Sequence, residues 1–402
     1  ACRSGNGARE SGDETTGVAA VGRARLASSQ ATPASRPTRM SRDVRATVHV
    51  AALRENLIRV RQLAPRSQVM AVVKADGYGH GLERVAQALR AADAFGVASI
   101  ADGLRIRAGG LDNRIVVLSG LDDAADIVEM RRLRLESVVH HVSQLELLAA
   151  APPGDPLRVW LKVDTGMHRL GFPLERVAAT HAALRMLASV DPRITLMTHF
   201  ANSDVFDDPI TRTQMARFAP LARELDGEHS LANSAAVLGF PESHAEWVRV
   251  GGLLYGISVV AGKPGPDFGF QPAMTLSARL VAIQDLARGE RIGYGQTYAC
   301  PEAMRVGVVA VGYGDGYPRH VRSGAAMLLG GRMAPVVGRV SMDLVTLDLR
   351  GHADARVGDE VVAWGRGLPV EHVAESAGTI GYELVCGMTR RVRFVEDDAP
   401  LP

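Results

Sequence analysis

Lys74 ends the apolar run QVMAVVK and directly precedes the segment ADGYGHG. A lysine amine that is partly buried loses its proton more easily than an exposed one. It can then form a Schiff base with an aldehyde cofactor. A surface lysine is the alternative for this residue taken alone, but the tyrosine and glycines that follow indicate a tight, shaped turn instead.

Four further apolar runs also end in residues that carry charge or hydrogen-bonding groups. In a barrel of parallel strands, the carboxyl ends meet at one rim, where barrel enzymes place their catalytic residues. Five runs with this feature favour a common site over five unrelated surface positions. The further residues are Lys162 and Asp164 in VWLKVD, His199 in LMTH, Asn233 and Ser234 in LANS, and Arg249 in WVRVGG.

The segment from about residue 46 to 260 alternates short apolar runs with helix-like stretches, as QVMAVVK is followed by LERVAQALRAA. The runs are continuously apolar, which indicates strands buried on both faces. About eight such units predict an α/β fold, a (β/α)8 TIM-type barrel. An open doubly wound sheet is the competing fold, although no G-x-G-x-x-G motif follows the first strand.

The character of the chain changes after the segment GKPGPDFGFQP at 262–272. The segments that follow are rich in strand-forming residues and are separated by glycine and proline turns. We therefore expect a cofactor-binding barrel over 40–272 and a mainly β domain over 273–402. Residues 1–39 have few bulky aliphatic residues, which predicts a disordered tail, an upstream-start artefact or, less favoured, a transit peptide.

The overall composition excludes several classes of protein. The net charge of +2 provides no field that would favour nucleic acid or acidic membranes. No apolar run reaches the roughly 18 residues that span a bilayer. Cys2, Cys300 and Cys386 lie far apart without metal-binding spacing. We expect a cytoplasmic protein with a small-molecule substrate and no metal.

The chain resembles the alanine racemases, barrel-type enzymes that use pyridoxal 5'-phosphate, over roughly residues 45–395. The resemblance rests on many motifs in one order, which makes it far more specific than any single motif. It implies racemisation of L-alanine and D-alanine by a homodimer with shared active sites, which supplies D-alanine for peptidoglycan or catabolises it. The motifs are AVVKADGYGHG, WLKVDTGMHRLGF, MTHFANSD, LANSAA, WVRVGGLLYG, RIGYGQTY, VGYGDGYPRH, VGRVSMDLV and GYELV.

The resemblance implies that Lys74 binds the cofactor as a Schiff base and is the base on one face of the substrate. Tyr294, in RIGYGQTY, is then the base on the other face and comes from the partner subunit. Racemisation requires this pairing, because one group removes a proton and the opposite group returns one. A turn aromatic that packs on Gly293 and Gly295 is the alternative for Tyr294 alone.

Arg249 resembles the arginine that faces the pyridine nitrogen of the cofactor. Arginine stays charged and only donates hydrogen bonds, so that nitrogen would remain unprotonated and side reactions would be discouraged. His199 is implied to link Arg249 with Tyr294, although a lone histidine at a strand end is more often structural. The related barrel decarboxylases have a carboxylate in place of this arginine.

The cofactor phosphate is implied to lie among hydroxyl groups and glycine N–H groups, which suit an anion that approaches closely. Asn233 precedes this group of residues and is expected to support its turn. The phosphate-binding residues are Tyr78, Ser234, Tyr382, Gly251 and Gly252.

Arg169 resembles the residue that binds the cofactor's phenolic oxygen and helps to hold the substrate carboxylate. Lys162 aligns with a lysine that is carbamylated in many members and orients that arginine. An ordinary ion pair between Lys162 and Asp164 is the alternative. His168 occupies a position where other members have glycine, which leaves the shape of this loop open.

Met342 and Asp343, in VSMDLV, are implied to line the substrate site from the partner subunit, with an ordinary β-turn as the alternative. Tyr313 and Tyr382 are expected to narrow the entrance. A narrow, aromatic-lined neck favours a small side chain and hence alanine, although one methylene changes discrimination by only about 1–3 kcal/mol.

Three other functions remain open at this point. A racemase of the same build could act on serine or on several amino acids, because pocket width decides the substrate. A decarboxylase that uses the same cofactor is disfavoured by Arg249 and by the Tyr294 motif. A non-catalytic cofactor-carrying protein is disfavoured by the second domain, which such single-domain barrels lack.

Overall fold

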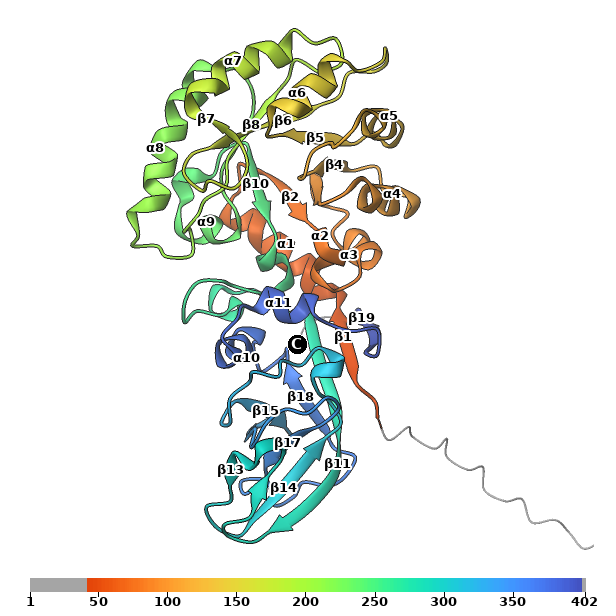
Figure 1. Ribbon diagram of the computed structural model, residues 1–402, viewed down its shortest axis with the longest axis vertical. Coiled ribbons are helices and arrows are strands. Elements are labelled where there is room, and N and C mark those ends of the chain that lie inside the picture. Colours follow the sequence, from red (N-terminus) through yellow and green to blue (C-terminus); the bar gives the residue numbers. More distant parts are fainter. Residues whose placement is uncertain (1–41, 400–402) are drawn as a thin grey trace, which may run out of the picture. The chain divides into compact units, whose positions relative to one another are not determined.

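The computed structural model describes residues 42–399, so the tail expected over 1–39 lies outside the described residues. It contains a closed barrel of eight parallel strands with helices around it, followed by a mainly β domain (Figure 1). The fold class predicted from the sequence is therefore confirmed. Within residues 42–399, no helix is both long enough and apolar enough to cross a lipid bilayer.

The barrel strands pair in sequence order, and pairing of the last strand, β10, with the first, β2, closes the ring. The strands are β2 (Gln68–Val72), β3 (Ala94–Val97), β4 (Arg114–Val117), β5 (Glu136–Val139), β6 (Val159–Asp164), β8 (Thr195–Met197), β9 (His229–Ser230) and β10 (Trp247–Val250). The short strand β7 (Phe172–Pro173) pairs with β6 outside the ring.

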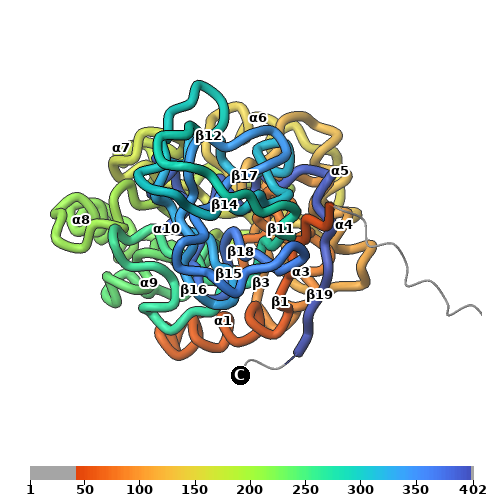
Figure 2. Tube along the Cα trace, turned by 90° about the horizontal axis from the view of Figure 1, so that it is seen from below, coloured from red at the N-terminus to blue at the C-terminus, as the bar shows by residue number. Residues whose placement is uncertain are grey.

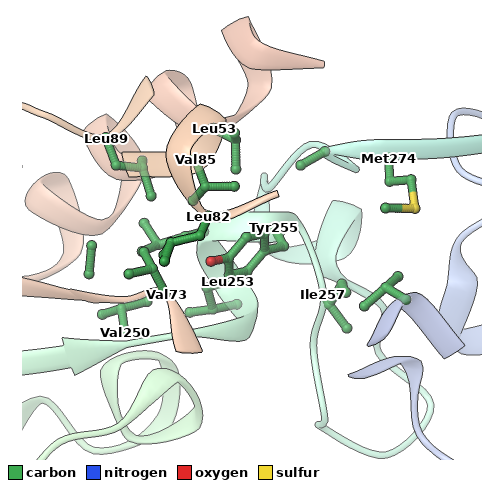
Figure 3. Close-up of a cluster of buried hydrophobic side chains, with 14 of the residues drawn as sticks. Leu53, Val73, Leu82, Val85, Leu89, Val250, Leu253, Tyr255, Ile257 and Met274 are labelled. Atoms are coloured by element: carbon green, nitrogen blue, oxygen red, sulfur yellow. The ribbon is translucent and has the colours of Figure 1, made fainter. Parts of the chain in front are cut away.

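Helices follow most of the barrel strands and bury an apolar stripe against their outer faces. The helices are α1 (Val50–Leu63), α3 (Leu82–Ala88), α4 (Ile100–Ala108), α5 (Ala124–Leu133), α6 (Val142–Ala149), α7 (Leu174–Arg185), α8 (Pro209–Glu224) and α9 (Ser234–Gly239). Figure 3 shows this packing where Leu82 and Val85 of α3 meet Val73, Val250 and Tyr255. These contacts hold Val73, the residue that directly precedes Lys74, in the apolar core.

The barrel interior is a separate apolar layer, because alternate residues of each strand point inward. Seven strands each contribute one buried residue to it, namely Met70, Ala94, Val116, Val138, Trp160, Met197 and Trp247. Two residues further along β6 and β10, Lys162 and Arg249 point in the same direction, above the apolar layer. The period of a strand therefore brings these polar side chains to the carboxyl rim.

A polar network closes the amino-terminal end of the barrel. Arg114 donates to both carboxylate oxygens of Glu136, at 2.6 and 2.9 Å. Its guanidinium also lies 4.6 Å from the ring centroid of Trp247, and Trp160 Nε1 donates to Glu136 at 2.8 Å. Glu136 is buried, so its charge depends on these partners.

Within the described residues, the β domain consists of one large sheet, a short hairpin, two α-helices and two short 3-10 helices, Tyr294–Gln296 and Tyr313–Asp315. The sheet contains β1 (Arg45–His49), β11 (Met274–Leu286), β14 (Met304–Val309), β15 (Ala326–Leu329), β16 (Arg332–Pro335), β17 (Val345–Asp348), β18 (Glu360–Trp364) and β19 (Arg393–Asp397). The hairpin is β12 (Arg291–Ile292) with β13 (Tyr298–Ala299), and the helices are α10 (Val370–Ala377) and α11 (Gly381–Cys386).

Strand β1 belongs to the sheet of the β domain although it precedes the barrel in the sequence. It pairs with β11 in antiparallel and with β19 in parallel orientation. Figure 2 shows β1 and β19 running next to each other. The segment that the sequence analysis assigned to the barrel therefore begins with a strand of the second domain.

Candidate active site

A cavity of ≈ 780 Å³ lies at the carboxyl ends of the barrel strands, and α11 of the β domain contributes Tyr382 and Cys386 to its wall. Most of the residues that the sequence predicted as a site line this one cavity. They are Lys74, Tyr78, Lys162, Arg169, His199, Asn233, Ser234, Arg249, Gly251, Gly252 and Tyr382. Residues from five barrel strands thus converge as their positions at the strand ends predicted.

The turn after Lys74 is left-handed, although it contains residues other than glycine. Ala75, Asp76 and Tyr78 have φ angles of 55°, 53° and 51°, with Gly77 at 62° between them. Each left-handed residue with a side chain costs about 1–2 kcal/mol, so surrounding contacts must hold the turn. Asp76 Oδ1, for example, accepts a hydrogen bond from the backbone N–H of Leu82 at 3.1 Å.

His80 and Tyr255 hold the other end of this turn. The Tyr78 ring stacks on Tyr255 with 4.7 Å between ring centroids. His80 is fully buried and its Nδ1 donates to the Tyr78 carbonyl at 2.8 Å. Burial lowers the pKa of His80 to about 4, although hydrogen bonds to backbone oppose the shift. The imidazole is therefore neutral near pH 7.

The cavity is electrically positive. Lys74, Lys162, Arg169 and Arg249 line it, whereas Asp204 is the acidic residue among the described residues of its wall. Burial and the charge of Arg169 lower the pKa of Lys74. Burial lowers the pKa of Lys162 to about 8, and Arg249 adds to the shift. Such a site favours anions and holds amines that lose protons easily.

Arg249 is buried among carbonyl oxygens rather than against a carboxylate. It donates to the carbonyls of Ser230 at 2.8 Å and Thr198 at 2.6 Å. Its Nη2 also lies 3.4 Å from Nδ1 of His199. Because a guanidinium only donates, Nδ1 accepts and the His199 proton resides on Nε2. Burial, followed by Arg249, keeps the pKa of His199 well below its usual value.

Two glycines form a cradle beside two tyrosine hydroxyls. A Cβ atom on Gly251 would lie 2.3 Å from Tyr78 Oη, and a Cβ on Gly252 would lie 2.1 Å from Tyr382 Oη. The Gly251 N–H donates to Ser234 Oγ at 3.0 Å. Hydroxyl and backbone N–H groups are thus collected at one place in the wall where side chains would not fit.

Asn233 supports this place by capping α9. Its Oδ1 accepts hydrogen bonds from the Ala236 N–H at 3.0 Å and from Ser203 Oγ at 2.9 Å. Both hydrogen bonds of the Asn233 side-chain oxygen are therefore made to other groups of the protein. This geometry agrees with a supporting role for Asn233 in the turn that precedes Ser234.

The loop that carries Arg169 is built on Asp164. Its Oδ1 accepts backbone N–H groups of Gly166, Met167 and His168 at 2.9–3.1 Å. His168 has a φ of 55°, which explains why glycine suits this position. The His168 ring lies 3.1 Å from Asp164 Oδ2, and this contact offsets part of the backbone strain. The carboxylate of Asp164 thus bonds to the loop.

Four predicted site residues do not line the cavity of the described chain. Tyr294, Tyr313 and Met342 are 71%, 38% and 51% exposed on the β domain. Tyr313 and Met342 lie on neighbouring turns, since the Tyr313 N–H donates to the Ser341 carbonyl at 3.1 Å. Asp343, next to Met342, forms ion pairs with Arg391 and Arg42.

Cys386 is a cavity residue that the sequence analysis did not single out. It lies four residues after Tyr382 on α11, so both side chains fall on the same face of that helix. Burial raises the pKa of its thiol, and the nearby charge of Lys74 opposes this shift. The helical spacing from Tyr382 is the signal that could have found it.

Comparison with known families covers almost the whole described chain. The model of the alanine racemase N-terminal domain matches residues 48–259, and that of the alanine racemase C-terminal domain matches residues 273–396. A protein from Nitrosococcus oceani named alanine racemase is 52% identical over 347 residues, which is 86% of this chain and 97% of the relative. A Shewanella loihica protein of the same name is 48% identical over 348 residues, 87% of this chain and 97% of the relative.

Solved structures agree with the sequence relatives. The biosynthetic alanine racemase from Pseudomonas aeruginosa superposes with a TM-score of 0.85 at 42% identity, over 88% of this chain and 99% of that chain. The alanine racemase from Acinetobacter baumannii gives a TM-score of 0.84 at 36% identity, over 89% of this chain and 100% of that chain. Both domains of the described chain are therefore represented in these structures.

Proposed function

The chain belongs to the alanine racemase family of isomerases, and from this premise we propose that it interconverts L-alanine and D-alanine with two bases. Lys74 is the base on one face of the substrate, and Tyr294 of the partner subunit is the base on the other. The observation that carries the proposal is the amine of Lys74, with its lowered pKa, in a cavity lined by three further cationic side chains. Such a cavity suits the carboxylate of an amino acid and an anionic cofactor.

The residues of the cavity fit pyridoxal 5'-phosphate. Tyr78, Ser234, Tyr382, Gly251 and Gly252 would hold its phosphate, since they gather hydroxyl and N–H groups where a Cβ would clash. Lys74 would bond to its aldehyde carbon, and Arg249 would face its ring nitrogen. When bound, this cofactor supplies a conjugated ring that withdraws electrons from the substrate Cα and so acidifies its C–H bond.

Tyr294 acts from a second subunit in this proposal. It is exposed on the β domain and does not line the cavity within its own described chain. In a homodimer that joins the β domain of one subunit to the barrel of the other, the phenol would reach the face of the substrate opposite Lys74. The exposed side chains of Met342, Asp343 and Tyr313 would then complete the substrate site and its entrance.

His199 prepares Tyr294 of the partner subunit for proton transfer. Its Nδ1 accepts from Arg249, so its Nε2–H is free to donate to the phenolic oxygen. This donated hydrogen bond stabilises the phenolate form that takes a proton from Cα. The proton returned to Cα comes from the residue on the opposite face, so the configuration inverts.

Arg169, which lines the cavity, would hold the substrate carboxylate and the phenolic oxygen of the cofactor. Lys162 would orient Arg169 once its amine has combined with carbon dioxide to form a carbamate, with release of a proton. An amine with a pKa of about 8 has the neutral fraction that this reaction requires. Asp164 accepts three backbone N–H groups and lies against His168, which does not favour a simple Lys162–Asp164 pair. Intact-protein mass spectrometry before and after acidification would detect the carbamate.

Alanine is the favoured substrate because the proposed entrance combines Tyr313 with Tyr382. The interconversion is symmetric for free alanine, so the direction, toward supply of D-alanine for peptidoglycan or toward its consumption, depends on the cell. Kinetics with L-alanine, L-serine and L-lysine test the substrate. Equal kcat/KM for lysine and alanine would contradict the assignment.

The two-base assignment is tested with Tyr294→Phe, which removes the phenolic oxygen and keeps the ring. We expect this variant to retain the yellow colour of the bound cofactor and to lose most D-alanine formation from L-alanine. Tyr298→Phe is a matched control, because Tyr298 lies in β13 of the same hairpin, and this variant is expected to keep its activity. Full activity of Tyr294→Phe would refute its role as a base.

A further inference from the structure

The carboxamide of Gln214 on α8 connects the loops that carry His199 and Arg169. Its Nε2 donates to the His199 carbonyl and to Thr165 Oγ1, both at 3.1 Å. Its Oε1 accepts the Ala201 N–H at 2.9 Å. Gln214 is 1% exposed and is not among the described residues that line the cavity. All three of its bonds are therefore made to the two loops rather than to solvent.

A directed chain of hydrogen bonds fixes the orientation of this carboxamide. Thr198 Oγ1 donates to the Val163 carbonyl at 3.0 Å, so it must accept from Thr165 Oγ1, which lies 2.7 Å away. Thr165 Oγ1 has then used its proton and accepts from Gln214. Because the Thr198 carbonyl also accepts from Arg249, the chain ends at the arginine of the cavity.

We propose that Gln214 is a positioning residue that sets the placement of His199 and of the Arg169 loop for catalysis. The inference rests on the proposed function, in which His199 and Arg169 act on the partner's tyrosine and on the substrate. Without the carboxamide, the Ala201 N–H and the His199 carbonyl each lose the side-chain partner that holds their loop. The two loops then relax, and the Nδ1 of His199 loses its alignment with Arg249.

Gln144 provides a matched control, because it forms the same kind of clamp on a different pair of loops. It is 3% exposed, its Nε2 donates to the Leu121 carbonyl at 3.1 Å, and its Oε1 accepts the His140 N–H at 2.8 Å. Gln144→Leu and Gln214→Leu therefore remove equivalent bonds. The first change affects loops that carry none of the proposed catalytic residues.

The experiment compares kcat, Tm and amide hydrogen exchange of the two leucine variants in the cofactor-loaded enzyme. We expect similar losses of Tm, at least about a tenfold loss of kcat in Gln214→Leu only, and little change in kcat for Gln144→Leu. Exchange of the Ala201 amide should accelerate in Gln214→Leu and stay unchanged in Gln144→Leu. Equal kcat values for the two variants, or unchanged exchange at Ala201, would overturn the proposal.

Gln214→Glu gives a reading that a merely structural role would not produce. A protonated carboxyl at this buried position can still donate one hydrogen bond, whereas a carboxylate cannot. We expect its kcat relative to wild type to fall as pH rises, while that of Gln214→Leu stays uniformly low. A relative kcat of Gln214→Glu that is independent of pH would count against a positioning role for Gln214.

Failure of this proposal can be told apart from failure of the proposed function. A wild-type enzyme inactive on alanine would refute the proposed function, whereas hydrogen exchange at the Ala201 amide would still test the Gln214 contacts.

Discussion

Gly252 of the barrel approaches Tyr382 of the β domain so closely that a Cβ on the glycine would lie 2.1 Å from the tyrosine oxygen. Gly251 stands in the same relation to Tyr78, at 2.3 Å. The backbone of Gly252 in the barrel thus contacts the hydroxyl of Tyr382 in the β domain, at the place that we propose for the cofactor phosphate. Glycine is therefore required at positions 251 and 252 because any Cβ atom there would clash with a tyrosine hydroxyl of the site.

Gly252→Ala is therefore expected to weaken cofactor binding at least about tenfold, because the added methyl group displaces the Tyr382 hydroxyl. The dissociation constant of pyridoxal 5'-phosphate, measured by absorbance titration of the apoenzyme, checks this. Gly351→Ala is the control, since a Cβ there would meet no atom within 4 Å. Unchanged affinity in Gly252→Ala would show that the phosphate lies elsewhere.

The variants Lys74→Ala and Tyr294→Phe are each expected to be inactive alone, and a mixed dimer of the two is expected to racemise alanine. In a dimer of Lys74→Ala with Tyr294→Phe, one site carries both changes and the other carries neither. Random pairing of equal amounts predicts about a quarter of the wild-type rate. D-alanine formation after coexpression, compared with each variant alone, is the measurement. If activity does not recover in verified mixed dimers, both residues act within one chain and the shared site is wrong.

His80 is expected to make the protein less stable in mild acid. Its pKa is about 4 in the folded state and about 6.5 in the unfolded chain. Between these values only the unfolded state binds the proton, so stability falls as pH decreases from about 6.5 to 4, by about 3 kcal/mol in total.

The comparison that isolates this effect uses urea unfolding of His80→Phe across the same pH range. The variant should lose this part of the slope while it remains less stable near pH 7, because the Tyr78 carbonyl loses its donor. His320→Gln, at an exposed position, should follow the wild-type curve. Parallel curves for wild type and His80→Phe would show that His80 takes up its proton in the folded state.

Arg114→Ala is expected to destabilise the barrel by about 3 kcal/mol, because it leaves the buried Glu136 carboxylate without its ion-pair partner. The cavity lies at the other end of the barrel, so kcat should be retained. Urea unfolding monitored by tryptophan fluorescence suits the measurement, since Trp160 and Trp247 belong to the network. Arg332→Ala breaks an ion pair with Asp354 whose side chains are 52% and 79% exposed, and it should cost less than about 1 kcal/mol.

The barrel and much of the site could be predicted from the sequence because both follow from local periodicity. Continuous apolar runs indicated parallel strands, and the polar residues at their ends necessarily meet at one rim. Lys74, Lys162, His199 and Arg249 all line the cavity for that reason. The resemblance to a family added roles for these residues that periodicity alone cannot supply.

Other features depend on contacts between distant parts of the chain. The left-handed turn at Ala75 and Asp76 is held by tertiary contacts, so local propensity does not predict it. The left-handed φ of His168 is accompanied by a ring contact with Asp164. The place of Tyr294 relative to the cavity would be decided by a second subunit and stays a prediction.

The pairing of β1 with both β11 and β19 has a consequence for how the molecule is made. Translation delivers residues 45–49 before the barrel and residues 393–397 well after it, so β1 lacks β19 as a neighbour while the barrel is being made. The barrel can close on the ribosome, but its companion sheet can reach its final width only after residues 393–397 have been synthesised. A protease that cuts between the two domains would likewise leave one fragment with a strand that belongs to the other.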